Sequence, residues 1–154
     1  MSEFFALVFW RQLLAALVGT LAFAVLFRVR PAHLPFAGAC GTIAFLLYYT
    51  VAFFGGSPFV AAFVSIGVAA ALSEWCARHR HAPSPVFLVP ASIPIVPGGD
   101  LYYTMRYLLS GELSSCADHL VKALLIGLGM AGGIVTVSML INLARSILRN
   151  EKTQ

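Results

Sequence analysis

Long apolar segments separated by short connections dominate this sequence. They cover residues 5–27, 36–54, 58–76, 86–99 and 123–144. A helix needs about 20 apolar residues to cross the hydrocarbon core of a bilayer, within a range of about 17–25. Helices can cross because they satisfy their own backbone hydrogen bonds in lipid. The segments therefore predict an all-α membrane protein with about five transmembrane helices, of which the fourth is short and interrupted.

Composition supports a single membrane domain. The chain is 60% hydrophobic and only 10% charged, whereas a soluble domain carries about 25% charged residues. We therefore interpret residues 1–154 as one integral membrane domain.

Basic residues predict how the chain crosses the membrane. Connections rich in Lys and Arg stay in the cytoplasm. Five crossings would place seven of the ten basic residues on that side: Arg28, Arg30, Arg78, Arg80, Arg145, Arg149 and Lys152. This predicts a multi-pass protein of the cell (inner) membrane with its N-terminus outside and its C-terminus in the cytoplasm. The five tyrosines fall toward the predicted outer side, at Tyr48, Tyr49, Tyr102, Tyr103 and Tyr107.

The fourth segment contains the most unusual stretch, Ile93-Pro94-Ile95-Val96-Pro97-Gly98-Gly99-Asp100. Proline lacks a backbone donor and clashes with the preceding turn, so a helix must kink or stop here. In a membrane such a break is tolerated where it lines a cavity or a solute path. The sequence therefore predicts a Pro-Gly break that borders such a path.

The depth of this break stays open. If the span is 86–99, Asp100 lies near the outer interface; if it is 86–109, the break falls about halfway across. In either case a new helix starts after Gly99, and its free N–H groups favour an anion such as a carboxylate. Asp100 is then interpreted mainly as an N-cap, a preferred role for aspartate. The alternative is a direct role in transport.

Small residues predict close packing of the last helix. Gly129 and Gly133 form a G-x-x-x-G pattern, which lets helix backbones approach each other in lipid. This face serves either internal packing or a homo-oligomer.

Other functional classes find little support. We find no nucleophile-base pair, phosphate-binding loop or paired catalytic carboxylates, so we expect no enzyme. The cysteines at 40, 76 and 116 lack metal-ligand spacing, and the histidines at 33, 79, 81 and 119 are interpreted as solvated. We expect no metal, no cofactor and no nucleic-acid partner, since the positive charge is spread over connections rather than gathered in a patch.

One stretch resembles a known signature. Residues 86–105 read Val-Phe-Leu-Val-Pro-Ala-Ser-Ile-Pro-Ile-Val-Pro-Gly-Gly-Asp-Leu-Tyr-Tyr-Thr-Met and resemble the threonine/serine exporter family, in particular its small membrane subunit. That subunit is equivalent to the C-terminal half of single-chain exporters. The stretch 23–29, Leu34-Pro35 and Gly41 resemble the family's first helix and following loop. Position 100 departs from the pattern, because many relatives are expected to have a small residue where this chain has Asp100.

The resemblance implies proton-driven export of small hydroxy amino acids, or in some relatives of a dicarboxylate such as succinate. It also implies a larger membrane subunit as partner. The break and the resemblance together predict a substrate path along Pro94, Pro97, Gly98, Gly99, Asp100, Tyr102 and Tyr103. As hypotheses, the free amides hold a substrate carboxylate while Asp100 meets its ammonium or carries the coupled proton. The other interpretations are a non-transporting assembly subunit and a small homo-oligomeric channel.

Overall fold

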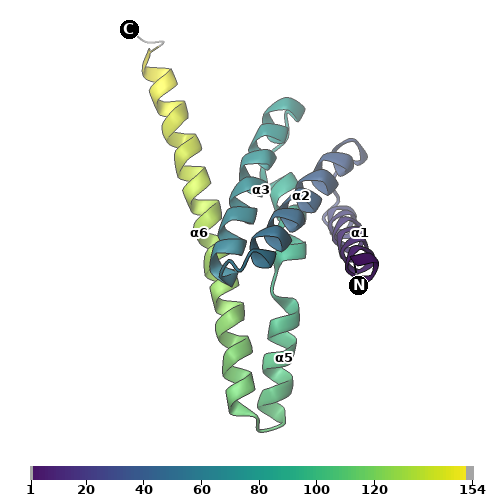
Figure 1. Ribbon diagram of the computed structural model, residues 1–154. Coiled ribbons are helices and arrows are strands. Elements are labelled where there is room, and N and C mark those ends of the chain that lie inside the picture. The colour runs from purple at the N-terminus through teal and green to yellow at the C-terminus, as the bar shows by residue number, and fades with distance from the viewer. Residues whose placement is uncertain (1, 152–154) are drawn as a thin grey trace.

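The computed structural model describes the backbone of residues 2–151 and the side chains of residues 9–147. Lys152 lies outside the described residues, and so does the side chain of Arg149. The described part of the chain consists of helices and turns (Figure 1). In order they are α1 (Ser2–Leu26), η1 (Pro31–His33), α2 (Leu34–Phe53), α3 (Pro58–Arg80), α4 (Pro85–Ser92), η2 (Ile93–Ile95), α5 (Gly98–Leu109) and α6 (Leu113–Glu151).

Four helical segments are long and apolar enough to cross a membrane, namely Phe9–Leu26, Pro31–Phe53, Pro58–Arg80 and Leu113–Ile147. The apolar stretch Pro85–Ile95 is shorter and contains α4 and η2. The predicted fold class is therefore confirmed: this is an all-α membrane protein whose fourth apolar segment is broken.

The core of the bundle consists mostly of alanine, which lets the helices approach closely. In one cluster Phe87 of α4 is fully buried among small side chains: Ala24, Ala37, Cys40, Cys76, Ala77 and Ala91. A second cluster joins α2, α3, η2 and α6 through Ala44, Ala62, Ile66, Ala69, Ile95 and Ile126. The broken segment is thus packed into the bundle on both sides of Pro94.

Helices α3 and α6 run in the same direction and touch through glycines. A Cβ at Gly129 would lie 2.5 Å from the carbonyl oxygen of Phe59, and a Cβ at Gly133 would lie 2.6 Å from that of Phe63. These distances are shorter than any real Cβ contact, so the two backbones lie directly against each other. Near the other end of the same interface Arg145 of α6 forms an ion pair with Glu74 of α3. The G-x-x-x-G face therefore packs within the chain.

A helical hairpin projects beyond the start of α3. Helix α5 turns back at Gly111, which has a φ of +78°, and packs against the first half of α6 (Figure 1). Helix α6 has 39 residues, which correspond to about 58 Å at 1.5 Å per residue. The hydrocarbon core is about 30 Å thick, so α6 is much longer than one crossing requires.

The α3–α6 contact makes a direct prediction about stability. We expect Gly133→Ala to lower the free energy of unfolding by about 1–3 kcal/mol, because the added Cβ forces the two backbones apart. Thermal or denaturant unfolding in detergent measures this. Gly127→Ala is the matched control on the same helix, since a Cβ there would meet no atom within 4 Å. Equal stability of the two variants would contradict the packing described.

Candidate functional site

Prolines end the fourth apolar segment in two steps. Pro94 lies in η2, and Val96 then leaves the helical region with φ −55° and ψ 128°. This conformation is expected, because the residue before a proline is pushed toward extended backbone. Pro97 follows as the N-cap of α5, with φ −77° and ψ 50°. The chain therefore starts a new helix at Gly98 instead of continuing the old one.

The start of α5 leaves backbone donors uncovered. The N–H of Gly98 donates to the Val96 carbonyl at 2.7 Å, and that of Leu101 donates to the Pro97 carbonyl at 3.0 Å. Between them, the N–H groups of Gly99 and Asp100 have no acceptor among the described residues. Such groups at a helix start carry a positive partial charge. They are suited to bind a carboxylate.

Gly98 and Gly99 keep this backbone open. Both are exposed, and a Cβ on either would meet no atom within 4 Å. Packing therefore does not require glycine at these positions. Their effect is to leave the free N–H groups accessible from outside the chain.

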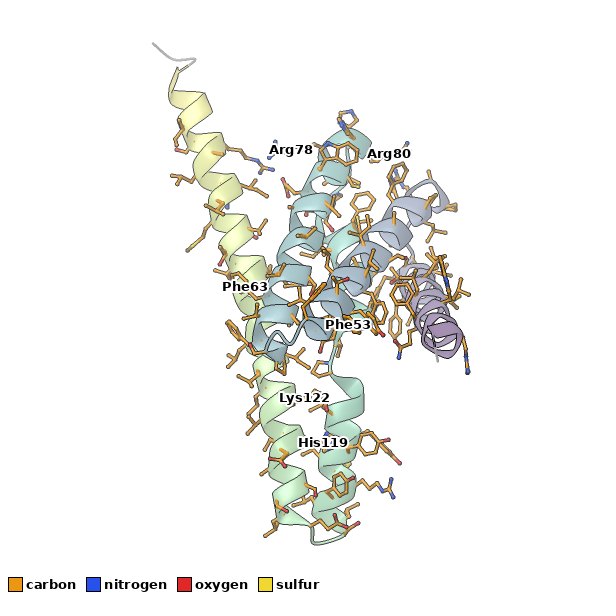
Figure 2. All side chains as sticks on the ribbon, viewed as in Figure 1. Phe53, Phe63, Arg78, Arg80, His119 and Lys122 are labelled. Atoms are coloured by element: carbon orange, nitrogen blue, oxygen red, sulfur yellow. The ribbon has the colours of Figure 1, made fainter. Side chains whose placement is uncertain are left out.

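Asp100 connects α5 to α6. Its Oδ1 lies 2.9 Å from Nδ1 of His119 and 3.3 Å from Nζ of Lys122, and its side chain is only 14% exposed. Figure 2 shows His119 and Lys122 on the side of α6 that faces α5. The interpretation of Asp100 as an N-cap is wrong. Pro97 is the cap residue, and Asp100 lies in the first turn with its carboxylate bonded across to α6.

Two tyrosines complete this cluster. The rings of Tyr103 and Tyr107 stack on the imidazole of His119, with centroids 5.3 Å and 5.5 Å away. Tyr102 instead is 64% exposed and touches only the edge of Tyr103 within the cluster. The interpretation of His119 as a solvated side chain is therefore wrong. We call Asp100, Tyr103, Tyr107, His119 and Lys122 the outer cluster.

Pro94 faces a different surface from the outer cluster. It borders an open groove of about 470 Å³ between α1 and α2. The groove is lined also by Gln12, Ala15, Ala16, Phe45, Tyr48, Tyr49 and Ala52. The predicted path residues therefore do not share one surface. Pro94 lies on this groove, and Gly98 and Gly99 are exposed. Asp100 and Tyr103 contact α6, whereas Tyr102 is exposed.

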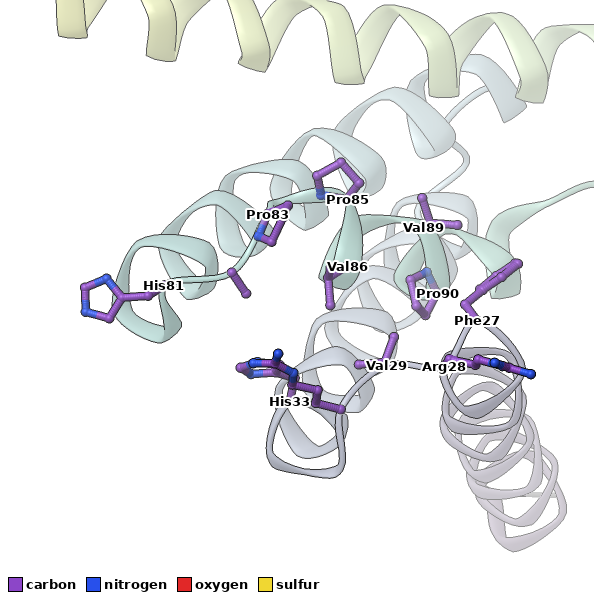
Figure 3. A pocket seen from close by; sticks show the side chains of 12 residues that line it. Phe27, Arg28, Val29, His33, His81, Pro83, Pro85, Val86, Val89 and Pro90 are labelled. Atoms are coloured by element: carbon purple, nitrogen blue, oxygen red, sulfur yellow. The ribbon is translucent and has the colours of Figure 1, made fainter.

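A second cavity lies at the basic end of the molecule. It has a volume of about 640 Å³ and lies between the α1–α2 connection and the start of α4 (Figure 3). Val86, Val89 and Pro90 form its α4 wall. The groove and this cavity therefore border the same broken segment, one on each side of Ala91, which is fully buried.

Packed side chains separate the two openings. Along α1, Ala16 lines the groove and Phe27 lines the cavity. Between them lies Thr20, which is fully buried and donates a hydrogen bond to the Ala16 carbonyl at 2.8 Å. The side chain of Thr20 lies directly on Gly41 of α2 and leaves no space for a Cβ there. This contact packs α1 tightly against α2 at a level between the groove and the cavity.

Sequence reasoning missed His119 and Lys122 as site residues. The available signal was their spacing of three residues, which places both on one face of a helix. Their pairing with Asp100 was not readable, because it joins residues 19 positions apart. The described side chains contain no group of three or more potential metal ligands.

Comparison with known proteins adds the family. A family model described as threonine/serine exporter, ThrE, matches residues 12–140. The match includes the break, the outer cluster and both glycines of the α3–α6 contact. No curated protein and no solved structure matches the chain in the corresponding searches.

The open start of α5 predicts a pattern of chemical accessibility. We expect Gly98→Cys and Gly99→Cys to react with a membrane-impermeant thiol reagent. Ile95→Cys should not react, because Ile95 is only 3% exposed. The native cysteines Cys40, Cys76 and Cys116 are buried and provide a low background. If the cysteines at positions 98 and 99 fail to react, no aqueous path reaches the break.

Proposed function

Because the chain belongs to the threonine/serine exporter family, we propose that it is a membrane subunit of a secondary exporter for threonine and serine. The exporter is driven by the proton gradient and includes a larger membrane subunit. The chain sits in the inner membrane with its N-terminus outside and its C-terminus in the cytoplasm. The family is a family of transporters, which agrees with the expectation that the chain is not an enzyme.

One observation carries this proposal: the uncovered N–H groups of Gly99 and Asp100 lie beside a carboxylate. Half-helix N-termini of this kind hold anionic groups of substrates in transporters. An amino acid offers a carboxylate to the amides and an ammonium to Asp100. A dicarboxylate would bring its second negative charge against Asp100, so the site favours a zwitterion over succinate.

The outer cluster supplies a means of proton coupling. Oδ1 of Asp100 contacts both Nδ1 of His119 and Nζ of Lys122. A substrate ammonium, a proton and these two side chains therefore compete for one carboxylate. A proton that arrives from outside neutralises Asp100 and releases the ammonium. Competition of this kind exchanges one amino acid for one proton.

The groove and the basic cavity support alternating access. They lie on opposite sides of the Thr20 contact; α4 borders the cavity, and Pro94 of η2 borders the groove. In the proposed cycle, movement of this short segment against α1 and α2 connects the break to one opening at a time. The pairing of Asp100 with Lys122, just before the apolar run that begins at Ala123, favours an outer position for the break.

The length of the broken segment supports a partner subunit. Helix α4 has 8 residues and η2 has 3, which together extend about 18 Å. This is well short of the roughly 30 Å of the hydrocarbon core. A larger subunit would complete the passage around this segment. If transport persists with every site residue of this chain replaced, the chain is an assembly subunit and its partner holds the site.

Asp100→Asn tests the site. We expect threonine export, measured with the partner present, to fall at least about tenfold, because a charge-assisted contact to the substrate ammonium is lost. Coupled proton movement should fall with it. Asp118→Asn is the matched control, since it removes an exposed carboxylate on α6 that lies outside the outer cluster. Unchanged export and coupling in Asp100→Asn would reject the role of this carboxylate.

The proposed orientation is tested separately. Ser57 lies in the connection between α2 and α3, and His79 is exposed near the end of α3. A single cysteine at position 57 should react with an impermeant reagent on intact cells, whereas one at 79 should react only after permeabilisation. The opposite pattern would invert the proposed topology.

A further inference from the structure

The ionisable side chains that line the basic cavity are all basic. Arg28, Arg30, His33 and His81 line it, and none of its described lining residues is acidic. The remaining walls are apolar and include Phe27 and Val89, which are 50% and 44% exposed. Figure 3 shows the proline-rich start of α4 on one side and the α1–α2 connection on the other. A cation-rich cavity with an apolar side suits an anion attached to an apolar group.

The backbone at this cavity is strained at two basic residues. Arg28 has a φ of +55° and His81 a φ of +51°, and they are the only non-glycine residues with positive φ in the described chain. At the opposite end, the corresponding positions are glycines, Gly55 and Gly111. A residue with a Cβ in the left-handed region costs free energy that glycine does not.

The helix dipole alone does not explain why Arg28 and His81, rather than glycines, occupy these left-handed positions. Cations stabilise the last turn of a helix, but any ordinary helical position in that turn would serve. Arg28 and His81 instead occupy the left-handed positions that follow α1 and α3, where glycine is the usual residue. Strain of this kind is typical of functional positions. Both strained residues line the same cavity.

His33 adds an unsatisfied polar atom. Its ring meets the edge of Phe87 with centroids 5.5 Å apart. Its Nδ1 is buried and has no hydrogen-bond partner among the described residues. Buried polar atoms are normally hydrogen-bonded. His33 therefore lines the cavity with an imidazole whose Nδ1 no hydrogen bond from the described residues holds in place.

We propose that the basic cavity binds a phosphate group, carried by the headgroup of an anionic phospholipid or free in solution. Arginine matches the geometry of phosphate oxygens with its planar fork of donors. The exported amino acid is a poor occupant, because no carboxylate of the cavity would meet its ammonium. Basic pockets between membrane helices on the cytoplasmic side are suited to lipid headgroups. The cavity is also one of the two openings in the proposed transport cycle, but phosphate binding is measured without transport, so either proposal can fail while the other stands.

The test measures the thermal midpoint of unfolding of the full chain in lipid nanodiscs. One comparison is between phosphatidylglycerol and phosphatidylcholine. The other is between phosphatidylcholine with and without inorganic phosphate, at constant ionic strength. Phosphatidylcholine also carries a phosphate, but its trimethylammonium group finds no acidic side chain in this cavity. We therefore expect a higher thermal midpoint with phosphatidylglycerol or with inorganic phosphate. A response to phosphatidylglycerol but not to inorganic phosphate identifies a lipid headgroup as the ligand. A response to inorganic phosphate identifies the free anion. A chain that responds in neither arm overturns the proposal.

Arg28→Gly is the most informative variant, because its effects on stability and on phosphate binding should have opposite signs. Relief of the left-handed backbone should raise the midpoint in phosphatidylcholine, while loss of the guanidinium should weaken phosphate binding at least about tenfold. Arg30→Gln should weaken binding without the gain in stability. Arg78→Gln is the control, since Arg78 lies at the same end of the molecule but outside the cavity (Figure 2). An undiminished response in both Arg28→Gly and Arg30→Gln would also overturn the proposal.

Discussion

The direct contact between the backbones of α3 and α6 is the constraint on which the outer part of the molecule depends. Gly129 and Gly133 pack α6 closely on the backbone of α3 at Phe59 and Phe63. Because α6 is one continuous helix, this contact also determines where its first half points. His119 and Lys122 lie on that half and receive Asp100. The position of the outer cluster is therefore set by packing that occurs several helical turns away from it.

The proline interruption uses the support that this packing provides. At the prolines, the packed segment formed by α4 and η2 ends, and α5 begins and runs alongside α6. The free amides at Gly99 and Asp100 are thus held between a rigid hairpin and a short, packed helix. Because α4 borders the basic cavity and η2 borders the groove, a small displacement of α4 and η2 would affect both openings.

The sequence predicted what depends on local rules and missed what depends on distant contacts. Long apolar segments indicated α1, α2, α3 and α6, and Pro94 with Pro97 indicated the break, because length and proline act through the backbone itself. Capping preference suggested the wrong role for Asp100, since its carboxylate is held by His119 from another helix. Likewise, nothing local marks Arg28 as left-handed, because basic residues rarely adopt that conformation.

Helix α6 also joins the two ends of the protein. It carries His119 in the outer cluster and Arg145 in the ion pair with Glu74, about 39 Å apart along the helix axis. This continuous helix contacts α3 at Gly129 and Gly133, between the two polar contacts. A tilt of this helix would shift both polar contacts at once, so the two ends of the protein are mechanically linked through it.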